Sequence, residues 1–206
     1  MREPGWLYLI RHGEVETRYH RVFGGKIDME LSPAGHLQVE ALAGYFQKVR
    51  LDSIYASPMR RVHQTLAPLV RQSGLAPTVL EGLREVDFGV WTGLRWDEVQ
   101  DRYQVSAFQW LEQLEIGGIA EAETVPDFRD RVARCLHEMV QDCAGRAIAI
   151  VCHGGVIRML LALLLDLPFR SMAAFEIEYA SVTRVKYRPG KVELDLLNLA
   201  LWRDVP

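Results

Sequence analysis

The chain has 206 residues and a mass of 23.5 kDa, a size that suits one domain with a substantial core. Its 24 Lys and Arg residues stand against 27 Asp and Glu residues, which gives a formal charge of −3. This balance disfavours nucleic acid or an anionic membrane as a partner, because such binding usually requires a surplus of basic residues. Taken alone, the same charge also argues against an anionic ligand.

The cysteines and the apolar runs indicate the cellular compartment. Three cysteines, without a CxxC pair, favour a reducing environment. The apolar run near the N-terminus is too short for a secretory signal, and the run at 159–165 is far shorter than the roughly 20 residues of a membrane span. We therefore expect a cytoplasmic protein. The six histidines lack metal-ligand spacing such as HExxH, so we expect neither a metal nor another cofactor.

The first third of the chain predicts two strands, each followed by a helix. Residues 6–10 form an apolar run that ends abruptly, which is typical of a buried strand. Ser32-Pro33 predicts a helix start, with Ser32 as the N-cap. Residues 52–56 predict a second strand, and Ser57-Pro58 repeats the same signal for a helix start. This second helix is expected to end near Gly74.

The rest of the chain continues the alternation of helices and strands. An aromatic-rich segment at about 95–124 predicts a mostly helical insertion, and apolar spacing predicts a helix from Val125 to Asp142. Residues 147–152 predict the most apolar strand, with a helix at 156–165. Two alternating segments near the C-terminus predict a hairpin. The order implies a single α/β domain over residues 1–206, with three α/β/α layers and a mainly parallel central sheet.

Polar residues gather where three of the predicted strands end. Arg11-His12-Gly13 follows the first strand, 57–61 follows the second, and His153-Gly154-Gly155 follows the most apolar one. Ligands of such sheets bind at the carboxyl ends of the strands. A lone histidine carries little information, but two histidines in the same strand-to-glycine setting favour a binding site over packing.

These residue types suit a tetrahedral oxyanion. The guanidinium groups of Arg11 and Arg61 can each bind two phosphate oxygens. The backbone N–H groups of Gly154, Gly155 and Val156 are expected to be free donors at the positive end of a helix. By contrast, Arg60 is expected to be a solvated helix residue, and Cys152 a buried, inert thiol.

Five sequence blocks, in this order, carry a resemblance. They are LIRHGE at 9–14, SPMRRVHQT at 57–65, LREVDFGVWTG at 83–93, ET with RV at 123–124 and 131–132, and VCHGG at 151–155. Together they resemble the motifs of the histidine phosphatase superfamily, the phosphoglycerate-mutase-like group, and the match runs from about residue 6 to residue 200. The resemblance implies a phosphoglycerate-mutase-like fold.

The resemblance also implies a mechanism. It makes His12 the nucleophile that accepts the phosphoryl group and Glu85 the proton donor, while Arg11, Arg61 and His153 stabilise the charge of the phosphoryl group. The substrate-binding residues would be Arg11, Arg61 and Gly154, together with Arg21 and Gly24. We therefore expect a metal-independent phosphatase that hydrolyses a small phosphate monoester.

Several points stay open at the level of sequence. The family usually has Ser or Thr where Val15 stands, Asn at Arg18 and Gln at Phe23, so other cations such as Arg18, Arg21 or Lys26 could contact the anion. The aromatic residues Trp91, Trp96 and Trp110 could line the leaving group or belong to the core. A phosphoglycerate-type mutase, an α-ribazole phosphatase and an inactive phospholigand-binding module are alternatives, and the C-terminal hairpin edge could pair two copies as a homodimer.

Overall fold

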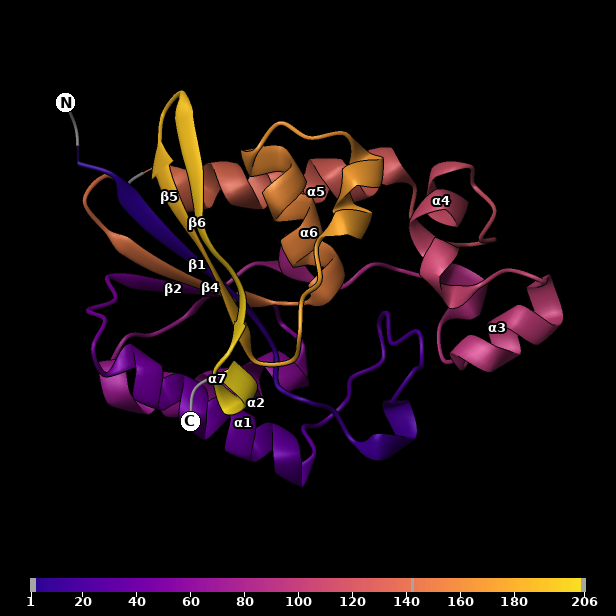
Figure 1. Cartoon of the computed structure of the whole chain (residues 1–206), viewed down its shortest axis with the longest axis horizontal. Helices are drawn as coiled ribbons and strands as arrows, with labels where there is room; N and C mark the ends of the chain where they lie inside the picture. The colour runs from indigo at the N-terminus through magenta and orange to yellow at the C-terminus, as the bar shows by residue number, and fades with distance from the viewer. Residues whose placement is uncertain (1–2, 142, 205–206) are drawn as a thin grey trace.

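A computed structural model describes residues 3–141 and 143–204 and contains a six-stranded sheet at its centre (Figure 1). The strand order is β3-β2-β4-β1-β5-β6. The strands are β1 Gly5–Arg11, β2 Ser53–Ala56, β3 Thr78–Val79, β4 Ala147–Cys152, β5 Ser181–Arg188 and β6 Lys191–Ala200. The first four pair in parallel, whereas β5 and β6 form the predicted antiparallel hairpin beside β1.

Strand β1 lies inside the sheet because both of its faces are apolar. Leu7 and Leu9 pack into one hydrophobic cluster, while Tyr8 and Ile10 pack into a second cluster on the opposite face. Neighbouring β4 divides its side chains between the same two clusters. A continuous apolar run is the pattern expected of a parallel strand covered on both sides.

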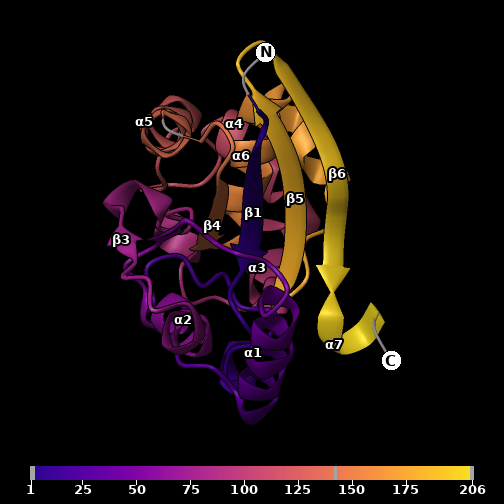
Figure 2. The same cartoon turned by 90° about the vertical axis from the view of Figure 1, so that its left-hand side faces the viewer.

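Helices cover both faces of the sheet, as Figures 1 and 2 show. Helices α1 (Pro33–Phe46) and α2 (Arg60–Ser73) pack on one face, and α5 (Val125–Val140) and α6 (Gly154–Leu164) on the other. The predicted three-layer α/β/α architecture with a mainly parallel sheet is confirmed. No helix in the described ranges is long and apolar enough to cross a membrane.

Two predicted helix starts were wrong. The side chain of Ser32 caps α1 by accepting a hydrogen bond from the N–H of Gly35, as expected. Ser57 caps nothing, because α2 begins only at Arg60, and its hydroxyl instead contacts a histidine of the candidate site. Helix α6 begins at Gly154 rather than at residue 156. Helix α5 runs to Val140, and its predicted end at Asp142 lies outside the described residues.

The segment between β3 and β4 carries short helices that project to one side of the molecule (Figure 1). They are α3 (Trp96–Tyr103), the 3-10 turn η4 (Ala107–Gln109) and α4 (Trp110–Glu115). The other short elements are η1 (Thr17–Tyr19), η2 (Glu81–Leu83), η3 (Gly89–Trp91), η5 (Phe169–Ala174) and α7 (Leu201–Asp204). The projecting helices form one wall of the cavity described next.

Candidate active site

The two histidines that follow strands come together at the carboxyl edge of the sheet. Strands β1 and β4 are neighbours in register, with Arg11 opposite Cys152, and the N–H of His12 donates to the carbonyl of Cys152 (3.1 Å). The ring centroids of His12 and His153 lie 5.2 Å apart, and both residues are buried. The parallel pairing of two strands distant in sequence therefore builds the centre of the site.

Arg61 joins the two histidines from the first turn of α2. Its Nε lies 3.2 Å from Nε2 of His12 and 3.3 Å from Nδ1 of His153, and its Nη1 donates to the carbonyl of Ile27 (2.8 Å). Burial lowers the pKa of Arg61 to about 10, with Glu85 opposing the shift. The guanidinium group therefore stays charged at neutral pH.

His12 has the form that a nucleophile requires. Burial, followed by the charges of Arg61 and Arg11, holds its pKa well below the usual value, so the ring is neutral. Its Nδ1 lies 2.8 Å from the carbonyl oxygen of Gly13. In a neutral ring, Nδ1 carries the proton for this bond, and Nε2 therefore carries the lone pair.

His153 contacts Arg61 through one ring nitrogen and Ser57 through the other. Burial and the charge of Arg61 lower its pKa well below the usual value. Because Nδ1 accepts from Arg61, the single proton of the neutral ring is on Nε2, which donates to Oγ of Ser57 at 2.8 Å. Oγ of Ser57 also accepts from the N–H of Met59 at 3.4 Å, so it bonds the residue before α2 rather than the first turn of that helix.

Two further arginines border the site, and sequence reasoning found only one of them. Arg11 donates from Nη1 to the carbonyl of Ile177 (2.7 Å), and its guanidinium carbon lies 3.9 Å from the centre of the Tyr179 ring. Its Nε is buried and has no hydrogen-bond partner among the described residues. A buried cationic donor without a partner suits the binding of an anion.

The second arginine, Arg158, was missed, although its spacing gave a signal. It follows Gly154 by four residues, which places it on the same face of α6. A Cβ at Gly154 would lie 3.1 Å from Nη1 of Arg158 and 3.6 Å from Nε of Arg11, so both cations lie over this glycine. Burial and the charge of Arg11 lower the pKa of Arg158. Within the described chain, neither arginine forms an ion pair with a carboxylate.

Glu85 faces these groups across the start of α6. One carboxylate oxygen accepts from the N–H of Val86 (3.0 Å) and the other from the N–H of Gly155 (3.3 Å). The expectation that the N–H of Gly155 is free was wrong, because Glu85 occupies it. A Cβ at Gly155 would lie 2.5 Å from the Glu85 carboxylate, so this close approach requires glycine.

These residues border one cavity of about 750 Å³. Arg11, His12, Arg61, Glu85 and Gly154 line one end, and His153 lies fully buried behind them. Of the loop residues expected to bind substrate, Arg21 and Gly24 line the same cavity. The apolar wall of the cavity consists of Phe88, Trp96, Ala107, Phe108, Trp110 and Leu111.

The remaining sequence candidates lie elsewhere or are already paired. Trp91 is a core residue, with 1% of its surface exposed. Arg18 pairs with Glu16 (2.9 Å) and Lys26 with Asp87 (2.6 Å). Arg60 points outward, as expected, and pairs with exposed Glu30. Cys152 is fully buried, and burial raises the pKa of its thiol, which keeps it protonated and unreactive.

Comparison with known proteins assigns a family to this fold and cavity. The family model described as histidine phosphatase superfamily (branch 1) matches residues 7–200. The chain belongs to the histidine phosphatase superfamily. The predicted family is confirmed, and the phosphatases among its relatives identify the chain as a phosphatase of this superfamily.

Individual relatives cover nearly the whole chain. It is 26% identical over 193 residues to phosphoserine phosphatase 1 of Hydrogenobacter thermophilus, covering 94% of this chain and 92% of that one. It is 26% identical to adenosylcobalamin/alpha-ribazole phosphatase of Salmonella typhimurium, covering 96% and 98%. The solved mycobacterial glucosyl-3-phosphoglycerate phosphatase superposes with a TM-score of 0.83 at 26% identity, covering 95% and 99%. Some relatives are longer, and the chain spans 56% of a bifunctional protein of Mycobacterium tuberculosis.

Proposed function

We propose that this histidine phosphatase hydrolyses a small phosphate monoester, without a metal, through a phosphohistidine intermediate on His12. The observation that carries the proposal is the neutral His12 ring, whose Nε2 lone pair lies among guanidinium groups that have no carboxylate partner in the described chain. An excess of buried positive charge favours a ligand with the charge of a phosphate dianion.

In the first step, the lone pair on Nε2 of His12 attacks phosphorus. The bond between phosphorus and the ester oxygen breaks, and its electron pair moves to that oxygen. The carboxyl group of Glu85 gives this oxygen a proton, so that the alcohol leaves neutral. The negative charge of a bound phosphate favours the protonated form of a neighbouring carboxyl group. Arg11, Arg61 and Arg158 offset the charge on the oxygens of the transferred group.

In the second step, water attacks the phosphorus of phosphohistidine. Its proton passes to the Glu85 carboxylate, the bond between phosphorus and nitrogen breaks, and the electron pair returns to Nε2. Inorganic phosphate leaves, and both His12 and Glu85 regain their starting states. One carboxyl group therefore serves as acid and then as base, because its position beside the reacting oxygen is the same in both steps.

The apolar wall supports a narrower choice of substrate. Trp96 and Phe108 stack edge to face with their centroids 5.4 Å apart, and Phe88 and Trp110 do so at 5.5 Å. Such a surface stabilises an alcohol with an apolar or aromatic face by removing that face from water. We propose that the preferred ester carries such an alcohol.

The test measures hydrolysis of 4-nitrophenyl phosphate in the presence of a chelator. The wild type is expected to release phosphate, and His12→Ala to lose at least about 10³-fold in kcat. Radiolabelled phosphate should be trapped on His12 after acid-free quenching. Equal rates for the two proteins would refute the proposal. Isomerisation of phosphoglycerate faster than phosphate release would favour a mutase, for which the same nucleophile and acid would serve.

A further inference from the structure

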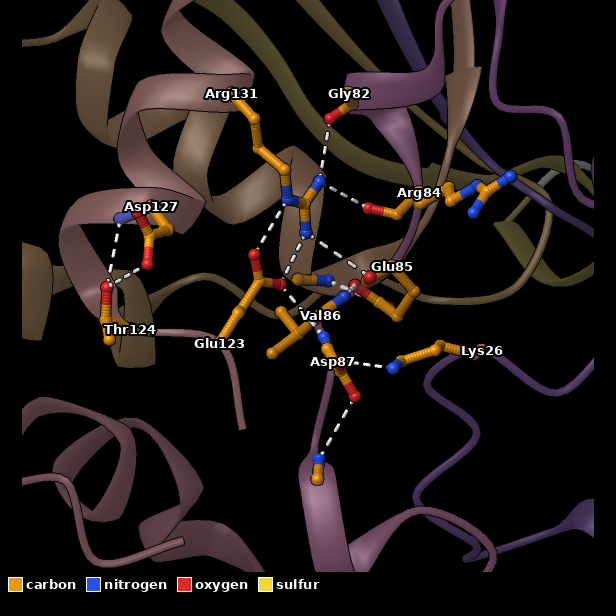
Figure 3. A network of polar contacts seen from close by, with 12 residues as sticks. Lys26, Gly82, Arg84, Glu85, Val86, Asp87, Glu123, Thr124, Asp127 and Arg131 are labelled. Carbon is orange, nitrogen blue, oxygen red and sulfur yellow. Dashed lines mark hydrogen bonds and ion pairs between the residues drawn. The ribbon is translucent and has the colours of Figure 1, made fainter. Parts of the chain in front are cut away.

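Arg131 does not line the cavity. It contacts the segment that carries Glu85, as Figure 3 shows. It extends from the second turn of α5, with 19% of its side chain exposed. Its Nη1 donates to the carbonyls of Gly82 and Arg84, both at 2.7 Å, and its Nη2 donates to the carbonyl of Glu85 at 3.3 Å. One guanidinium group thus binds three carbonyls within four residues.

The partner of Arg131, Glu123, holds the other side of the same segment. The two side chains form a bidentate ion pair, with distances of 2.8 Å and 2.6 Å, and only 13% of the Glu123 side chain is exposed. The oxygen of Glu123 that accepts from Nη2 also accepts from the N–H of Asp87 at 2.9 Å. The ion pair therefore fixes backbone groups on both sides of Glu85, as Figure 3 shows.

The segment needs these contacts because its own backbone does not hold it. Residues 85–88 lie between η2 and η3 and belong to neither a helix nor a strand. Neighbouring Gly82 packs so closely on α5 that a Cβ there would lie 2.8 Å from the carbonyl of Arg131. Without a repeating backbone pattern, the position of Glu85 depends on tertiary contacts, and those of Arg131 and Glu123 reach the backbone on both sides of it. Lys26 adds an ion pair with Asp87 at 2.6 Å.

We propose that Arg131, with Glu123, is a positioning residue that holds the Glu85 carboxyl where it can give a proton to the leaving oxygen. The proposal rests on the function proposed above. It assigns no contact with substrate to Arg131, which acts through the backbone of residues 82–87. A displacement of about 1 Å at a reacting group can cost about 10²-fold in rate.

This role predicts a dependence on the leaving group that a general loss of folding would not produce. Proton donation matters most when the departing oxygen is strongly basic, and least for 4-nitrophenolate, which is stable without a proton. Esters of 4-nitrophenol, phenol and 4-methoxyphenol have rings of similar size, so they should contact the apolar wall alike. Their kcat/KM values report the step in which the ester bond breaks.

The experiment compares Arg131→Gln with Arg134→Gln on this series. Arg134 lies on the exposed face of the same helix, so its variant controls for the loss of a charge on α5. For Arg131→Gln we expect kcat/KM to fall less than about fivefold with 4-nitrophenyl phosphate and roughly 10²-fold with 4-methoxyphenyl phosphate. Arg134→Gln should match the wild type on all three. In a Glu85→Gln background, adding Arg131→Gln should cost little more.

Hydrogen–deuterium exchange of residues 82–88 supplies a readout that does not depend on activity. Exchange should be faster in Arg131→Gln than in the wild type and unchanged in Arg134→Gln. An equal loss of kcat/KM on all three esters, or unchanged exchange, would overturn the positioning role. If the wild type hydrolysed none of the esters, the proposed function would fail, and the exchange result would still decide whether Arg131 orders this segment.

Discussion

The two ends of the cavity are built differently. At the phosphate end, His12, Arg61 and His153 follow neighbouring strands and contact one another directly, and each is almost fully buried. At the leaving-group end, the wall comes from short helices joined by loops, and Phe108 has 79% of its surface exposed. Buried, mutually bonded groups suit chemistry that requires fixed geometry, whereas an apolar wall that includes exposed Phe108 can accept different alcohols.

Of the substitutions that compare the two ends, one at Arg61 is expected to lower kcat/KM the most. Arg61→Met should lower kcat/KM about 10³-fold, because the transferred group loses a buried cation. Since the charge of Arg61 lowers the pKa of His12, removing it should raise that pKa, and the acidic limb of the kcat/KM profile should move to higher pH. The matched control is Arg60→Gln, which removes only exposed ion pairs and should stay within about twofold of wild type. A pH profile of Arg61→Met identical to that of the wild type would contradict this account of His12.

A second substitution tests whether the Glu85 carboxyl group must lie close to the start of α6. Gly155→Ala adds a Cβ 2.5 Å from the Glu85 carboxylate, so the carboxyl must move, and kcat/KM should fall about 10- to 100-fold. In α1, Gly44 has open space around its Cβ position, so Gly44→Ala should leave activity unchanged and stabilise the helix by about 0.5–1 kcal/mol. Thermal unfolding and kinetics on both variants check the pair. Full activity in Gly155→Ala would show that Glu85 need not occupy its present position.

The smallest effect is expected at the apolar wall. Phe108→Ala should raise KM about 2- to 10-fold for aryl phosphates, because it removes an aromatic contact with the alcohol. The same variant should leave KM for methyl phosphate unchanged, since this ester has no apolar face to bury. Because Phe108 is exposed, the variant should unfold at the same temperature as the wild type. An equal rise in KM for both esters would place Phe108 outside the leaving-group site.

Most of the fold could be predicted because its signals are local. Apolar runs mark strands covered on both faces, and the side chain of Ser32 marks a helix start. The error at Ser57 shows where local reasoning ends. Its hydroxyl has two competing partners, a helix end and His153, and only the approach of β4 to β2 decides between them.

The sequence by itself determined the family, the layer order and the grouping of Arg11, His12, Arg61 and His153, because these residues stand at or just after the ends of three apolar strands. It did not identify Arg158, which lies one turn into α6. The tertiary structure alone placed Tyr179 beneath Arg11, Gly155 against Glu85 and Arg131 behind the acid segment. Each of these contacts joins residues tens of positions apart or more. Their geometry arises from the packing of whole elements, which no short sequence pattern encodes.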